Sequence, residues 1–172
     1  MDYLNGYASP LGGITLASDG DALTGLWFDG QKHFAETLSG EAPEKELPVF
    51  DTAKRWLDVY FKGVSPDFTP PLNLRGSGFR KAVWDILLTI PFGQTMTYGE
   101  IAKKFSARMS AQAVGNAVGH NPVSIIVPCH RVVGANGSLT GYAGGLDKKI
   151  KLLELEKADL SGFFVPKRGT AL

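Results

Sequence analysis

Two short apolar segments near the N-terminus flank residues that favour a tight turn. Residues 13–17 and 22–28 have the composition of strands, and Asp19-Gly20 lies between them, which predicts a β-hairpin. Apolar side chains then recur at the spacing of one helix face. They are Ala53, Trp56, Leu57, Tyr60 and Phe61. The pattern predicts a small α/β unit made of a hairpin and a helix.

A proline-rich stretch, residues 65–71, separates this unit from the rest of the chain and favours extended backbone. We therefore place a first domain of structural role at 1–70, a linker at 71–75 and a second domain at 76–172. The chain has 172 residues, of which 44% are hydrophobic, so it is long enough to form two small cores.

The second domain begins with apolar residues that form one helical stripe and stop at Pro91. The stripe is predicted to face the core. It comprises Phe79, Val83, Ile86, Leu87 and Ile90.

Two further helices are predicted from their capping residues. Thr97 can cap a helix that starts at Tyr98, with Glu100 placed as in a capping box. After a short connection, Ser110 can cap a helix over 111–119. Two short helices with a tight joint suggest a helix-turn-helix, and an ordinary pair of antiparallel helices fits the same pattern.

The second of these helices is rich in alanine and glycine, so its backbone can approach a partner closely. It lacks the Arg, Lys and Glu side chains that discriminate base edges, and Gln112 is its one long polar side chain near the start. Lys103, Lys104 and Arg108 can meet phosphates nearby. This composition favours a protein that holds DNA without reading its sequence.

Charge is unevenly divided along the chain. Residues 1–75 contain 6 Lys and Arg against 11 Asp and Glu, whereas residues 76–172 contain 12 against 6. The second half is therefore the one suited to a polyanion. No apolar run is long enough to span a membrane, and the first residues do not resemble a signal peptide. We expect a cytoplasmic protein with no membrane partner.

The chemistry is expected at Cys129-His130, which contains the only cysteine of the chain. The apolar run 125–127 precedes Pro128, and this pattern predicts that a strand ends there. A neighbouring imidazole can turn a thiol into a nucleophilic thiolate. Taken alone, the dipeptide is more typical of a buried structural cysteine than of a catalyst.

No metal or other cofactor is expected. A single cysteine excludes an intrachain disulfide, and His33, His120 and His130 do not have the spacing of metal ligands.

Two features follow the cysteine. Residues 134–145 form a glycine-rich segment that can line a ligand pocket, although it lacks the lysine pattern of a phosphate-binding loop. The last helix places Lys149 and Glu156 on one apolar face. A buried Glu156 needs a partner, for which His130 is a candidate; alternatively, the carboxylate lies in water at the edge of the stripe.

Several motifs, in order over residues 77–157, resemble the O6-alkylguanine-DNA alkyltransferases, or methylated-DNA–protein-cysteine methyltransferases. The resemblance implies an α+β fold: a small N-terminal domain, then a mainly helical domain with a helix-turn-helix and an active-site cysteine turn. The motifs are Pro91-Phe92-Gly93, Thr97-Tyr98-Gly99-Glu100, Ala113-Val114-Gly115, Asn121-Pro122, Pro128-Cys129-His130-Arg131-Val132-Val133 and Gly141-Tyr142-Ala143-Gly144-Gly145.

This resemblance implies direct repair of alkylated double-stranded DNA by a monomer. The damaged base, O6-alkylguanine or O4-methylthymine, is flipped out of the duplex, and Cys129 takes the alkyl group irreversibly, once per molecule. His130 accepts the thiol proton through a water, and Glu156 orients His130. Asn121 holds the segments beside the cysteine, and Tyr98 bonds the base.

The resemblance also assigns residues that bind substrate or DNA, some of them through the backbone. They are Tyr98, Gln112, Ala113, Arg131, Val132, Ser138, Tyr142, Ala143 and Lys149, together with the backbone of Cys129.

One residue departs from the family pattern. Gln112 stands where most members place an arginine that fills the gap left by the flipped base. Glutamine adds no charge and cannot stack as a guanidinium does, so we expect weaker binding to DNA. Some members of the family bind zinc through N-terminal cysteines and histidines, which are absent here. Related proteins that only bind lesions have replaced the active-site cysteine, whereas this chain keeps it.

Three alternatives follow from the same residues. A cysteine hydrolase can use Cys129, His130 and Asn121, and would turn over without DNA. A helix-turn-helix regulator would bind one DNA sequence whether or not Cys129 is present. A lesion-recognition protein would bind the damaged base without transferring the alkyl group.

Overall fold

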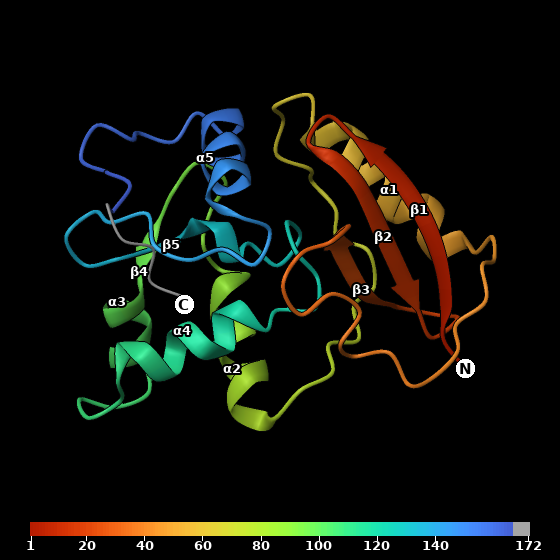
Figure 1. Cartoon of the computed structure of the whole chain (residues 1–172), viewed down its shortest axis with the longest axis horizontal. Coiled ribbons are helices and arrows are strands. Elements are labelled where there is room, and N and C mark those ends of the chain that lie inside the picture. Colours follow the sequence, from red (N-terminus) through yellow and green to blue (C-terminus); the bar gives the residue numbers. More distant parts are fainter. Residues whose placement is uncertain (167–172) are drawn as a thin grey trace. The chain divides into compact units, whose positions relative to one another are not determined.

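The computed structural model describes residues 1–166, which divide into two compact units (Figure 1). The N-terminal unit consists of residues 1–76 and 122–126. The C-terminal unit consists of residues 77–121 and the described residues from 127 onward. In residues 1–166, no helix combines the length and the apolar character that crossing a bilayer requires.

The N-terminal unit is built on a three-stranded antiparallel sheet of order β1-β2-β3. The predicted hairpin is confirmed as β2 (Gly12–Ser18) and β3 (Leu23–Phe28), and the Asp19 carboxylate accepts hydrogen bonds from the turn amides of Asp21 and Ala22. Strand β1 (Tyr3–Ser9) was not predicted, because Asn5 and Gly6 interrupt its apolar pattern.

Helix α1 (Pro48–Tyr60) contacts β2 and β3 (Figure 1). It begins before the predicted apolar stripe because proline suits the first turn of a helix. Four of the five expected residues are buried, whereas Phe61 follows the helix and is only partly buried. The predicted hairpin-plus-helix core is therefore present, with one more strand.

Both edges of this sheet are covered. Leu4 of β1 pairs with residues 43–45, and Leu23 of β3 exchanges hydrogen bonds with Pro71 and Asn73. The start of the expected linker, 71–75, is thus bound to the sheet. Covered edges prevent pairing with other strands.

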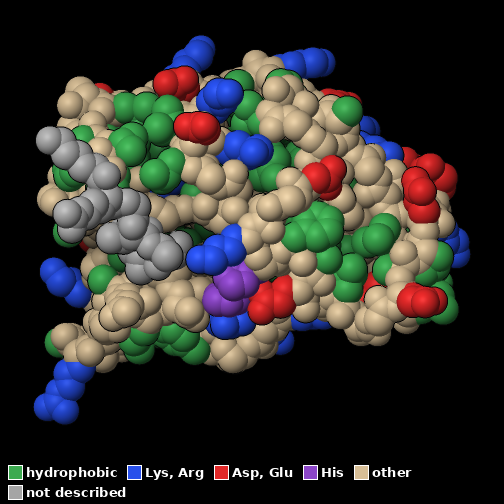
Figure 2. All heavy atoms as spheres, viewed as in Figure 1, with side chains coloured by type: hydrophobic (Ala, Val, Ile, Leu, Met, Phe, Trp, Pro, Cys, Tyr) green, Lys and Arg blue, Asp and Glu red, His purple; other side chains and the backbone are tan. Residues whose placement is uncertain are grey.

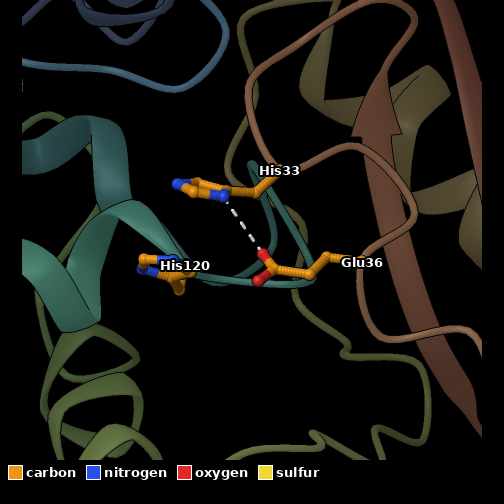
Figure 3. Close-up of side chains that lie close together, drawn as sticks. All are labelled: His33, Glu36 and His120. Atoms are coloured by element: carbon orange, nitrogen blue, oxygen red, sulfur yellow. Dashed lines mark ion pairs between the residues drawn. The ribbon is translucent and has the colours of Figure 1, made fainter.

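Most charged side chains of this unit lie at its surface. His33 Nδ1 lies 3.1 Å from Glu36 Oε2 (Figure 3). Asp2 is an exception: its carboxylate is buried and lies 2.7 Å from Nη2 of the partly exposed Arg75. On the face drawn in Figure 2, acidic side chains gather over this unit, in keeping with its negative charge balance.

The C-terminal unit is mainly helical. Its elements are α2 (Gly78–Leu87), β4 (Met96–Thr97), α3 (Tyr98–Lys103), α4 (Ala111–Gly119), a 3-10 turn (Cys129–Arg131), β5 (Val132–Val133) and α5 (Leu146–Leu155). Strands β4 and β5 pair in parallel, which links the start of α3 to the segment after the cysteine.

The stripe predicted around α2 is only partly correct. Val83, Leu87 and Ile90 are buried, whereas Phe79 and Ile86 are half-buried. Trp84, which lies outside that stripe, is fully buried, and its indole N–H donates to the carbonyl of Ala117 at 2.8 Å. A packed aromatic ring with a hydrogen-bond partner thus fixes α2 against α4.

Both predicted helix caps are confirmed. Thr97 Oγ1 accepts from the Glu100 amide and Ser110 Oγ accepts from the Ala113 amide, each at 3.0 Å. Helices α3 and α4 pack together as in a helix-turn-helix. Gln112 on α4 is exposed, as are Lys103, Lys104 and Arg108 before it.

Candidate active site

Cys129 begins a tight turn in the C-terminal unit. The prediction that a strand ends at Pro128 is wrong: residues 124–126 form turns, Ile125 has a φ of 72°, and the short strand β5 comes after the cysteine. The apolar run resembles a strand because its side chains are buried, but its backbone is irregular and does not form part of a sheet. Cys129 is only 5% exposed.

The thiol lies at a small pocket formed by three parts of the C-terminal unit. These are α3, the end of α4 and the glycine-rich segment. The lining residues are Tyr98, Val118, Gly119, Cys129, Gly141, Tyr142 and Ala143. Val118 and Gly119 are not among the site residues expected from the sequence, because small or apolar residues give no chemical signal. Gly141 lies in the glycine-rich segment that was expected to line a pocket.

Burial raises the pKa of the Cys129 thiol, and this effect outweighs a hydrogen bond with Asn121 and the nearby charge of Lys149. The resting thiol is therefore protonated. Asn121 also donates to the carbonyl of Val127 at 2.7 Å, so it joins the two ends of the C-terminal unit that residues 122–126 separate in sequence.

The fold brings His130 and Glu156 together. His130 Nε2 lies 2.6 Å from Glu156 Oε2, and both side chains are buried. Burial lowers the pKa of His130 although Glu156 acts in the opposite sense, so the imidazole is neutral. Because a carboxylate only accepts hydrogen bonds, Nε2 carries the ring proton and Nδ1 carries the basic lone pair.

Glu156 is held by two further residues through three hydrogen bonds. Arg131 Nε donates to Oε1 at 2.8 Å, Arg131 Nη2 donates to Oε2 at 3.0 Å, and the Gly93 amide donates to Oε1 at 2.9 Å. Burial raises the pKa of Glu156, but the hydrogen bonds from His130 and Arg131 lower it by more than burial raises it, so the pKa is lowered overall. The carboxylate is therefore ionised.

Position 93 requires glycine for two reasons. Its φ is +81°, and a Cβ there would lie 2.9 Å from the carbonyl oxygen of Glu156.

The side chain of Arg131 points into the protein. Besides its two bonds to Glu156, Nη1 donates to the carbonyl of Ile90 at 2.6 Å, and the residue is only 8% exposed. The family resemblance predicts that Arg131 contacts substrate or DNA. In the structure its guanidinium is instead placed to hold Glu156. The rule that a buried carboxylate needs partners could have pointed to Arg131.

The other expected residues fall into three groups. Tyr98, Tyr142 and Ala143 line the pocket, and the Tyr98 hydroxyl donates to the carbonyl of Thr140 at 3.2 Å. Lys149, Val132 and Ser138 are buried outside the pocket lining. Gln112 and Ala113 lie at the start of α4, where Gln112 is exposed.

A buried cysteine next to a His–Glu pair, in the same unit as a helix-turn-helix, is the arrangement expected of a DNA-binding protein with a cysteine nucleophile. Residues 78–158 match the profile described as 6-O-methylguanine DNA methyltransferase, DNA binding domain, and residues 3–74 match that of its ribonuclease-like domain. The chain belongs to the 6-O-methylguanine DNA methyltransferase family.

Individual relatives agree with this assignment over most of their length. A methylated-DNA–protein-cysteine methyltransferase of Mycobacterium tuberculosis is 48% identical over 159 residues, which cover 90% of this chain and 94% of the relative. One from Methanosarcina acetivorans is 46% identical, with 87% and 95% covered. The crystal structure of Mycobacterium tuberculosis OGT in complex with DNA is similar with a TM-score of 0.81 and 46% identity, and 90% and 92% of the two chains are covered. The expected α+β fold is confirmed.

Proposed function

We propose that this protein repairs double-stranded DNA by moving the alkyl group of O6-alkylguanine onto Cys129. The observation that carries the proposal is the buried Cys129 thiol at the pocket, followed directly by the buried His130–Glu156 pair. The relatives described above are named as methyltransferases that act on methylated DNA and a protein cysteine.

The depth of the thiol dictates how DNA must be presented. Cys129 cannot reach the O6 position of a base that remains stacked, so the damaged nucleotide has to leave the duplex and enter the pocket. The exposed start of α4 and the basic residues before it, Lys103, Lys104 and Arg108, hold the duplex. Gln112 occupies the gap left in the stack, and Ala113 allows close approach to the backbone.

Inside the pocket, Tyr98 and Tyr142 contact the base, and the backbone of Cys129 and Ala143 bonds its edge. The backbone of Val132, outside the present lining, reaches the base once it is bound. The hydroxyl of Tyr98 donates to Thr140 in the protein as described, and shifts to the base when it binds. Arg131, with its guanidinium on Glu156, acts in this proposal by holding the carboxylate rather than by contacting DNA.

The proton of the thiol leaves as the reaction proceeds. It passes through a water to the neutral His130, and ionised Glu156 stabilises the imidazolium that forms. The sulfur bonds to the alkyl carbon while the bond from that carbon to O6 breaks, and the electron pair stays on the guanine. A proton then returns to the guanine, which leaves as the normal base.

The product on the protein is a thioether, so each molecule reacts once. We propose that O4-methylthymine reacts in the same way, that the protein acts as a cytoplasmic monomer and that it uses no metal or other cofactor. Domain 1–70 supports the fold, and domain 76–172 binds DNA and carries out the transfer.

The test is the intact mass of the protein after incubation with a duplex that contains one O6-methylguanine. We expect a gain of one methyl group per molecule, located on Cys129 by peptide mapping, and no gain in a Cys129→Ser control. Lesion binding without a mass gain would identify a recognition protein. Turnover of a small ester or amide without DNA would identify a hydrolase.

A further inference from the structure

Lys149 is a buried cation that takes part in no chemical step of the proposed transfer reaction. It lies on α5 with a relative exposure of 0%. Its Nζ donates to three backbone carbonyls: Val132 at 2.6 Å, Thr140 at 3.0 Å and Gly141 at 3.0 Å. An ammonium group has three N–H donors, so these bonds use its full capacity and leave none for a substrate.

The three carbonyls belong to the two segments that enclose the thiol. Val132 follows the turn that carries Cys129 and His130, and its amide donates back to the carbonyl of Cys129. Gly141, Tyr142 and Ala143 line the pocket, and Thr140 directly precedes them; residues 140–143 are together called the wall. Lys149 therefore ties the cysteine turn to the opposing wall.

No regular secondary structure fixes this part of the wall, although Tyr142 accepts a hydrogen bond from the Gly145 amide and its ring lies edge-on to His130. Residues 139–143 have no helix or strand, and Gly141 has a φ of +64°, so the local sequence does not define its path. The Tyr98 hydroxyl also donates to Thr140, but that bond has to change if Tyr98 turns to the base. Loss of the lysine would remove a donor from the buried carbonyl of Val132 and from the partly buried carbonyls of Thr140 and Gly141, which is costly.

We propose that Lys149 is a positioning residue that holds the wall 140–143 at the distance from Cys129 that a flipped alkylguanine requires. This inference rests on the proposed function, because it concerns the same pocket. It assigns Lys149 to the protein backbone instead of to the substrate. Burial lowers the pKa of Lys149 to about 8, while the nearby Cys129 acts in the opposite direction.

The test compares two reactions of Cys129 in Lys149→Met. Methyl transfer from the O6-methylguanine duplex needs the wall, whereas alkylation of the same thiol by iodoacetamide does not. We expect at least a tenfold slower transfer and a much smaller slowing of iodoacetamide alkylation, which reports the loss of the Lys149 charge near the thiol. Affinity for unmodified duplex should be unchanged. Lys151→Met, a matched loss of charge at an exposed position on α5, should behave as the wild type does.

Equal slowing of both reactions would overturn the proposal, because the charge of Lys149 near the thiol would then account for the whole effect. Unchanged transfer would overturn it as well. If the wild type itself gained no methyl group, the proposed function would fail, whatever the behaviour of the lysine variant.

A second measurement needs no variant and applies if Lys149→Met does not fold. Above pH 8, a neutral amine has two N–H donors for three carbonyls. Hydrogen exchange of the wild type at pH 7 and pH 9, corrected for the intrinsic rate, should show loss of protection at the Gly145 amide, which donates to Tyr142 in the same wall. Cys129 and His130 are titratable groups whose charges interact with Lys149. The thiol is blocked by alkylation in a parallel sample, and His130, whose pKa is lowered, is neutral at both pH values. Equal protection at both pH values, or equal loss in α4, would overturn the proposal.

Discussion

The two units of this protein differ in what they bury. The N-terminal unit encloses mainly apolar side chains, such as Leu16, Trp27 and Phe50, and its Asp2–Arg75 ion pair has a partly exposed arginine. The C-terminal unit also has an apolar core, but it buries the ionised Glu156, Arg131 and Lys149 within hydrogen bonds.

Burial of charged groups is expensive, and a well-paired buried ion pair stabilises a fold little more than apolar packing does. The charges in the C-terminal unit are therefore not explained by stability alone. Each of them lies one contact from His130 or from the wall of the thiol pocket. The difference between the units thus separates a region held mainly by apolar packing from one in which buried charges surround the candidate active site.

The largest effect should come from the loss of His130, the proposed general base. His130→Ala should slow methyl transfer about 10²- to 10⁴-fold, which is typical for the loss of a general base, while lesion binding changes little. Single-turnover mass spectrometry and duplex titration measure the two quantities. His33→Ala, in the N-terminal unit, is the control and should leave both unchanged. An equal loss of transfer and lesion binding would assign His130 to structure.

Removal of the buried carboxylate should affect both stability and transfer. Glu156→Ala leaves the guanidinium of Arg131 buried without its anion, which costs about 3–5 kcal/mol of unfolding free energy. Leu57→Ala creates a cavity in the N-terminal unit and should cost about 2–5 kcal/mol. Urea unfolding measures these losses.

Only the first variant should also slow transfer under conditions where both proteins remain folded. A comparable slowing in Leu57→Ala would show that the N-terminal core influences the chemistry and would remove the distinction between the two units.

Acid should weaken the C-terminal unit before the N-terminal one. The lowered pKa of His130 means that the unfolded state takes up a proton below about pH 6.5 while the folded state resists it, so stability falls as pH decreases from there. The pKa of Glu156 is also lowered, and its contribution is lost in turn below about pH 4.5.

In the N-terminal unit, hydrogen bonds from Arg75 lower the pKa of Asp2, whose ordinary value is 3.8, so its contribution is lost only below that pH. Each pKa unit between folded and unfolded states corresponds to about 1.4 kcal/mol. Hydrogen exchange followed separately in α5 and β2 from pH 7 to pH 4 measures the order. Simultaneous loss of protection in both would contradict it.

The sequence predicted the elements whose signals are local. The Asp19-Gly20 turn and the Thr97 and Ser110 caps depend on nearby backbone amides, and each lies where it was expected. Strand β1 and the irregular run before Cys129 depend on distant pairing, which no local pattern reports. Trp84 was missed for the same reason, since its partner Ala117 lies on another helix.

The site shows the same limit. The expectation that a buried Glu156 meets His130 rested on a general rule about buried carboxylates, and the two residues do lie in contact. The rule gives no number of partners, so the support from Arg131 and Gly93 became visible only in the structure. Lys149 was expected to contact the substrate because of the family resemblance. Its hydrogen bonds to three backbone carbonyls leave no trace in a sequence.

The smallest expected effect concerns the surface that meets DNA. Gln112→Arg adds a cation that can stack in the gap left by the flipped base, an interaction worth about 0.5–1 kcal/mol at an exposed site. Duplex binding should therefore tighten about two- to fivefold and depend more steeply on salt, as fluorescence anisotropy at several salt concentrations would show. Gln94→Arg makes the same substitution at an exposed position outside α4. If neither variant tightened binding, or both did so equally, the start of α4 would not be the part of the C-terminal unit that enters the duplex.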